Sequence, residues 1–138
     1  MFDHCLYFNT TALARRLERE WAAAFKPFAL TPPQGFMLRV VLGRPGLAQR
    51  ELADALAIAR PTATRALDGL AARGLVERRA GGDDGRESFV FPTGAAQQIH
   101  AALNEASGRV TRRLKKHLGE VAFDDAVGRV RGVRAALG

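Results

Sequence analysis

Cysteine is almost absent from this chain of 138 residues, in which Cys5 is the only one. A single thiol allows no internal disulfide and no cluster of thiolates around zinc. The three histidines do not compensate, because no two of them stand at a spacing typical of metal ligands. The sequence therefore predicts neither a metal site nor a bound cofactor.

Serine is also scarce, with only Ser88 and Ser107 in the chain. A serine nucleophile needs a base held beside it, and no histidine is paired in sequence with either serine. A small enzyme with a helical core is therefore disfavoured, and we expect a protein that acts by binding.

Long apolar runs are missing as well. None approaches the length of a membrane span, and the first residues, "MFDHCLYFNT", lack the basic, apolar and small-residue order of a signal peptide. The length suits one domain with a real core. We expect a single domain over residues 1–138, in the cytoplasm and without a membrane partner.

Basic residues are abundant. The formal net charge is +7, and 18 of the 21 basic residues are arginine. Arginine makes paired hydrogen bonds to phosphate and guanine, so this composition favours a polyanionic partner, nucleic acid first.

The order of predicted elements is helical except for one hairpin. Apolar spacing, caps and breakers predict helices over residues 5–26, 32–42, 47–58, 61–73, 94–117 and 120–137. Residues 75–80 and 87–92 flank a glycine-rich turn and read as a β-hairpin. The fold class is mainly α with a small β-hairpin wing, in the order of a winged helix-turn-helix.

The helix over residues 61–73 has two distinct sides. Ala63, Leu67 and Leu70 fall on one side and are expected in the core, whereas Arg65 is at the centre of the opposite side. Asp68 lies on that second side, and either Arg65 or a wing arginine could pair with it.

The start of this helix is the candidate DNA-binding surface. Arg60, Pro61, Thr62, Thr64 and Arg65 combine small, hydrogen-bonding and basic side chains, which allow close approach to a DNA groove. A solvated face without a partner is the alternative. The helix before it and the hairpin after it favour DNA, because together they form a known docking module.

The chain resembles the MarR family of bacterial transcriptional regulators. The resemblance is carried by "ELADALAIARPTATRALDGLAARGLVERR" and by "DDGRESFVFPTG", with Ala48, Pro61 and Pro92 as departures from the usual residues. It implies a homodimer whose recognition helix enters the major groove, with Thr62, Thr64 and Arg65 as contacts. It also implies that Arg86 of the wing reaches the minor groove and that Asp84 orients a nearby arginine.

The same resemblance implies a division of the chain. Residues 31–94 correspond to a winged-helix DNA-binding lobe, and residues 1–30 and 95–138 to dimerisation helices. The implied partners are double-stranded DNA, a second copy of the chain and a small-molecule effector. The expected function is a repressor of transcription that binds a pseudo-palindromic operator.

Two alternatives stay open. Some MarR relatives sense peroxides through a cysteine near the first helix, so Cys5 is a candidate redox residue, although Tyr7 lies nearer the corresponding position. Residues two apart in a helix do not face each other, which favours an effector between the first and the long fifth helix. A winged-helix module that binds protein is the other alternative.

Overall fold

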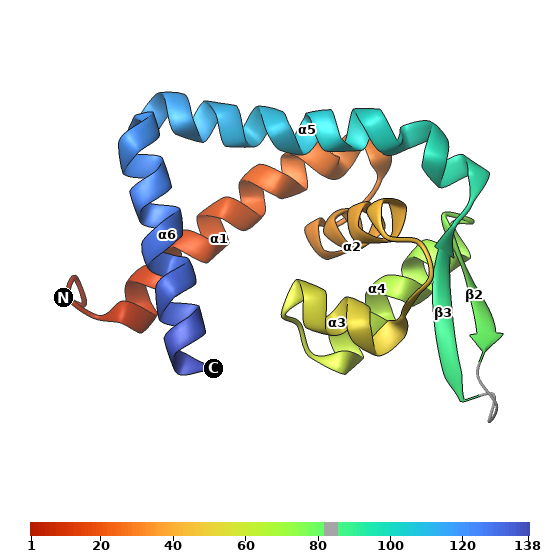
Figure 1. Ribbon diagram of the computed structural model, residues 1–138. Helices are drawn as coiled ribbons and strands as arrows, with labels where there is room; N and C mark the ends of the chain where they lie inside the picture. Colours follow the sequence, from red (N-terminus) through yellow and green to blue (C-terminus); the bar gives the residue numbers. More distant parts are fainter. Residues whose placement is uncertain (82–85) are drawn as a thin grey trace.

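The computed structural model describes residues 1–81 and 86–138. In chain order the elements are α1 (Leu6–Phe25), η1 (Lys26–Phe28), α2 (Pro32–Gly43), β1 (Leu47–Ala48), α3 (Gln49–Leu56), α4 (Arg60–Ala72), β2 (Val76–Gly81), β3 (Glu87–Pro92), α5 (Gly94–Leu118) and α6 (Glu120–Leu137) (Figure 1). The predicted mainly helical fold with a small β wing is confirmed.

Side-chain caps fix the starts of two helices as the sequence predicts. The Thr31 hydroxyl accepts a hydrogen bond from the Gln34 amide at 3.3 Å, and the Gln34 side chain accepts one from the Thr31 amide at 3.0 Å. The Thr93 hydroxyl accepts from the Ala96 amide at 3.3 Å and donates to the Gly74 carbonyl at 2.6 Å. Thr93 therefore starts α5 and also holds it against the end of the recognition helix.

The predicted helical segment 47–58 is shorter in the structure, where α3 covers Gln49–Leu56 with Ala48 at the predicted N-cap position. Leu47 and Ala48 form β1, which pairs antiparallel with Val90 and Phe89 of β3, so the sheet has the order β1-β3-β2. Only the Glu51 half of a capping box exists, in which the Ala48 amide donates to the carboxylate at 2.9 Å. At the other end the helix stops at Leu56, because Ala57 takes a left-handed conformation with φ of 54°.

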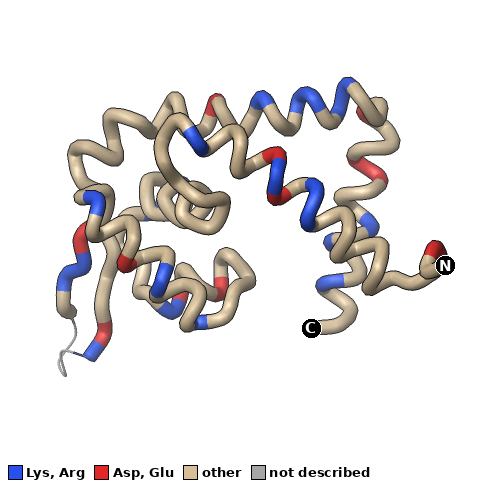
Figure 2. The backbone as a smooth tube through the Cα atoms, turned by 180° about the vertical axis from the view of Figure 1, so that it is seen from behind, with Lys and Arg blue, Asp and Glu red and all other residues tan. Residues whose placement is uncertain are grey.

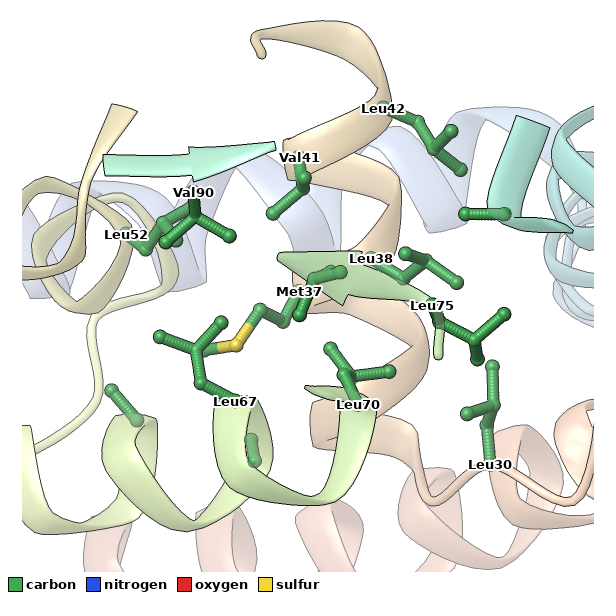
Figure 3. Packing of buried hydrophobic residues seen from close by; sticks show 14 of the residues in the cluster. Leu30, Met37, Leu38, Val41, Leu42, Leu52, Leu67, Leu70, Leu75 and Val90 are labelled. Carbon is green, nitrogen blue, oxygen red and sulfur yellow. The ribbon is translucent and has the colours of Figure 1, made fainter. Parts of the chain in front are cut away.

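The hydrophobic core lies inside the winged-helix lobe. Helix α2 passes through its middle, and its Met37, Leu38 and Val41 are fully buried. In Figure 3 the Met37 side chain reaches toward Leu67 of α4. The buried cluster also includes Leu52, Leu70, Leu75, Val76 and Val90. Packing of α2, α3, α4 and the sheet around this core fixes the orientation of the recognition helix, α4.

The two ends of the chain, residues 1–30 and 95–138, which we call the arm, are far less buried than the lobe. Helix α5 runs from the wing across the molecule, and α6 turns down at its far end (Figure 1). Helix α6 has no buried residue, and Phe25 is the only buried residue of α1. Among the described residues, no helix has both the length and the apolar character needed to cross a bilayer.

Arg73 connects the end of α4 to the N-terminal part of the arm. It follows the last residue of α4 and donates hydrogen bonds to the carbonyls of Ala29 at 2.6 Å and Phe28 at 2.8 Å. These carbonyls lie in the connection between α1 and α2, so the end of α4 is held to the end of α1.

Candidate nucleic-acid interface

The exposed side of α4 carries the residues predicted to meet DNA. Arg60, Pro61, Thr64 and Arg65 are exposed and Thr62 is half-buried. The opposite side is in the core, as predicted, through Ala63, Ala66, Leu67 and Leu70. Hydrophobic periodicity alone therefore predicted which side of α4 is buried and which is exposed.

Arg65 is held only weakly. Its Nη2 approaches the Thr62 hydroxyl at 3.5 Å, which is at the outer limit for a hydrogen bond. A long, exposed guanidinium with so little local restraint is free to reorient toward a base edge or a phosphate.

Thr64 has a structural task that the sequence did not indicate. Its hydroxyl donates to the Arg60 carbonyl at 3.0 Å and accepts from the Gln49 side-chain amide at 3.0 Å. Thr64 therefore joins α3 to α4. Its hydroxyl proton is already used, so toward DNA it can offer only its methyl group and a remaining lone pair.

A groove of about 330 Å³ runs between α3, the start of α4 and residues 86–88 at the start of β3. We call it the basic groove, and its polar lining consists of Gln49, Arg50, Arg60, Thr64, Arg86, Glu87 and Ser88. Among the described lining residues, three arginines and one carboxylate give the groove a net positive charge.

Arg50 and Glu87 face each other in this groove. The Arg50 Nε donates to the Glu87 carboxylate at 2.8 Å, joining α3 to β3. This hydrogen bond, together with the negative charge of Glu87, raises the pKa of Arg50. Sequence reasoning missed both residues, since they are 37 positions apart.

A second ion pair joins the other wing strand to α4. Arg78 of β2 donates to the Asp68 carboxylate at 2.6 Å, so the partner of Asp68 is a wing arginine and not Arg65. Arg78 is the more buried of the two, with 28% of its side chain exposed against 62% for Asp68. Its Nε is buried without a hydrogen-bond partner in the described part of the chain. The wing is thus tied to both helices of the helix-turn-helix.

The predicted wing arginine, Arg86, is exposed, directly precedes β3 and lines the basic groove. Asp84 lies outside the described residues, so its proposed role in orienting an arginine stays a prediction. Figure 2 shows Lys and Arg along α5 as well as on this lobe, and the positive charge is therefore not confined to one surface.

Known proteins are similar to this chain in sequence and in fold. A model of the MarR family matches residues 30–87, from just before α2 to the first residue of β3. Residues 30–87 are therefore similar to a MarR-type domain. Members of the MarR family are DNA-binding transcriptional regulators and not enzymes.

Individual MarR-type relatives are similar over most of the chain. The HTH-type transcriptional regulator YybA of Bacillus subtilis is 28% identical over 111 residues, which cover 80% of this chain and 69% of that protein. The transcriptional repressor CouR, solved with a 23-mer DNA duplex, is 25% identical with a TM-score of 0.86, covering 96% of this chain and 94% of CouR. The PcaV regulator of Streptomyces coelicolor, solved with its natural ligand, is 26% identical with a TM-score of 0.73, covering 87% of this chain and 89% of PcaV.

The candidate redox residue lies at the start of α1. Cys5 is exposed, and its Sγ accepts a weak hydrogen bond from the Phe8 amide at 3.5 Å, which makes it the N-cap of the helix. Tyr7 is 77% exposed. In the described residues no group of three or more His, Cys, Asp and Glu side chains gathers as metal ligands would.

The aromatic side chains of α1 and η1 differ in burial. Phe25 is fully buried in the core, Tyr7 is exposed, and Trp21 and Phe28 are half-buried.

A polar cluster joins α1, α2 and α5 at the point where the arm meets the lobe. The buried Ser107 hydroxyl accepts hydrogen bonds from Trp21 Nε1 at 3.0 Å and from Arg39 Nη1 at 2.9 Å. Arg39 also donates to the Asn104 side chain at 2.8 Å, and burial lowers its pKa. Sequence reasoning missed Arg39, although a single charge in the apolar run "FMLRVVL" was a signal of it.

Proposed function

We propose that the protein is a homodimeric repressor that binds a pseudo-palindromic DNA site and releases it when a small molecule binds. One observation carries the DNA part of this proposal. The exposed side of α4, with Arg60 and Arg65, adjoins the basic groove, where Arg50 and Arg86 add two further cations. Such a continuous basic surface suits a base-reading helix flanked by phosphate contacts.

The residues divide by the type of contact. Arg65, at the centre of the exposed side of α4, is assigned to a base edge, with Thr62 beside it. Arg60, Pro61 and Thr64 are assigned to the close approach of the start of α4 to the DNA. Arg86 is assigned to the minor groove next to the wing, where a narrow, A·T-rich groove attracts arginine, with Asp84 orienting a nearby arginine.

Exposed apolar side chains on the arm support the dimer. Val127, Val130 and Val133 of α6 are 40–49% exposed, and Leu137 is 81% exposed. Phe2, Leu6, Phe8 and Leu13 near the other end of the chain are also exposed. Apolar surface of this extent on residues 1–30 and 95–138 suits burial against a second copy.

The polar cluster at Arg39 supports control by a small molecule. Arg39 donates hydrogen bonds to the neutral acceptors Asn104 and Ser107, and it links the lobe helix α2 to the arm helix α5. A molecule that entered this junction would change the angle between arm and lobe. PcaV, which was solved with its natural ligand, is a precedent for a ligand-binding relative.

A mobility-shift titration tests the proposal. The probe is the DNA upstream of the gene for this chain, and the titration is repeated at two salt concentrations. We expect tight binding that weakens as salt rises, because phosphate contacts release counterions. Binding that ignores salt, or the absence of binding at low salt, would favour a protein-interaction module instead.

A further inference from the structure

One carboxylate lies inside the basic groove. The groove contains the guanidinium groups of Arg50, Arg60 and Arg86, and Glu87 is the only acidic residue among its described lining. DNA bound along the exposed side of α4 and against the wing would bring its backbone over this groove. A buried or half-buried carboxylate at this place opposes phosphate binding, because the two negative charges repel each other.

Within the groove, Glu87 forms an ion pair with Arg50. Glu87 is 37% exposed at its side chain and Arg50 is 62% exposed, so solvent and ligands can reach both. The contact uses Arg50 Nε at 2.8 Å, in the position that a phosphate oxygen would otherwise take. In the free protein this arginine is therefore already neutralised by its own chain.

We propose that Glu87 competes with the DNA backbone for Arg50 and so limits the strength of sequence-independent binding. The inference rests on the proposed DNA face, and it assigns to Glu87 a role in setting affinity. When a backbone phosphate enters the groove, Arg50 exchanges the carboxylate for the phosphate, and Glu87 is left beside a negative ligand.

The net positive charge of the chain explains why weaker sequence-independent binding would be useful. A protein with a formal charge of +7 binds any DNA through phosphate contacts, and such binding competes with the search for a specific site. A carboxylate in the groove weakens the sequence-independent contact and leaves base contacts by Arg65 unchanged.

The test compares Glu87→Gln with the parent protein on a mixed-sequence DNA duplex. Glutamine keeps the size of the side chain and can still accept a hydrogen bond from Arg50, but it carries no charge. We expect the dissociation constant to fall about three- to tenfold, as removal of one nearby like charge predicts. The plot of log affinity against log salt should become steeper by about one unit. Fluorescence anisotropy at several salt concentrations measures both.

Glu77→Gln is the matched control. Glu77 lies on β2 of the same wing and is paired with Arg79 at 2.6 Å, but it does not line the groove. The two variants change the net charge equally. Less than about a twofold gain is expected for Glu77→Gln, because a distant exposed charge is screened.

The variant pair with Arg50→Ala tests the mechanism. If Glu87 acts by occupying Arg50, then Glu87→Gln in the Arg50→Ala background should gain no more than Glu77→Gln does in the parent. Thermal melting without DNA shows whether each variant is folded.

The outcomes separate this inference from the proposal beneath it. If the parent binds DNA with the expected salt dependence but Glu87→Gln binds equally or more weakly, Glu87 is a structural tie for the wing and the inference is wrong. If the parent does not bind the duplex at any salt concentration, the proposed DNA face fails together with the inference.

Discussion

At the scale of single residues, Arg65 and Arg50 show two ways in which an arginine is presented to a partner. Arg65 has one weak contact within its own helix, whereas Arg50 is bound by a carboxylate from another strand. Guanidinium groups of the same charge thus differ in what a ligand must displace. The sequence alone does not distinguish these two arginines, because both are expected to be exposed on helices.

Replacement of Arg65 by alanine tests its assignment to a base. We expect Arg65→Ala to weaken binding to the specific site by about 1–3 kcal/mol and to relax the base preference at the centre of each half-site. Competition titrations against single-base variants of the operator measure this. Lys26→Ala, which removes the same charge from an exposed position in η1, should bind like the parent. An Arg65→Ala variant with unchanged base preference would remove Arg65 from the groove.

Cys5 allows a prediction about the signal. Its Sγ caps α1 through a weak hydrogen bond, and serine is a good cap, so Cys5→Ser should keep the fold and DNA binding. If a small molecule is the effector, the variant should also keep the normal response to it. Mobility shifts with and without peroxide check the alternative. Release of the parent by peroxide, with the variant still bound, would establish redox sensing.

At the scale of elements, the wing depends on its ties to the two helices. The Asp68–Arg78 pair is partly buried, and the Arg78 side chain is less exposed than that of Asp68. Removing one partner of such a pair leaves a charge without compensation, which costs more as burial increases.

We therefore expect Asp68→Asn to lower the free energy of unfolding by about 1–2 kcal/mol, between the values typical of exposed and buried pairs. Urea denaturation monitored by circular dichroism measures it. Asp125→Asn is the control, because its pair with Arg129 has side chains 65% and 81% exposed and should contribute less than about 0.5 kcal/mol. Equal losses in the two variants would mean that the wing tie adds no stability.

The elements also show what a sequence can and cannot reveal. The two sides of α4 and the caps at Thr31 and Thr93 were predictable, because periodicity and capping act over a few residues. Strand β1 was not, since Leu47 and Ala48 are extended only through pairing with Val90 and Phe89.

The site was predictable to a similar extent. The exposed residues of α4 follow from its apolar spacing. The bonds of Thr64 with Gln49, Asp68 with Arg78 and Arg50 with Glu87 join different elements, so they depend on tertiary packing that no local pattern encodes.

At the scale of the whole molecule, the arm would determine the distance between the lobes of two copies in the proposed dimer. Helix α6 exposes an apolar stripe at helical spacing and has no buried residue. If a second copy covers this stripe, two recognition helices can reach successive major grooves about 34–36 Å apart.

Charge placed in the stripe should therefore separate the copies. We expect Val130→Glu to be monomeric at micromolar concentration and to lose most of its affinity for the operator, because one lobe alone makes half of the contacts. Light scattering and a mobility shift measure the two effects. Ala135→Glu adds the same charge about 140° around the helix and should stay dimeric. A parent that is monomeric would exclude the proposed assembly.

The hydrogen bond between Trp21 and Ser107 has an optical consequence. Trp21 is the only tryptophan of the chain and donates to a buried hydroxyl that also binds Arg39, at the junction of arm and lobe. The intrinsic fluorescence of the protein excited at the indole band therefore originates at one point. A change in hydration or in the bond to Ser107 will shift or quench that emission. The unlabelled protein is thus its own spectroscopic reporter for compounds that enter the junction, in a titration that needs no DNA.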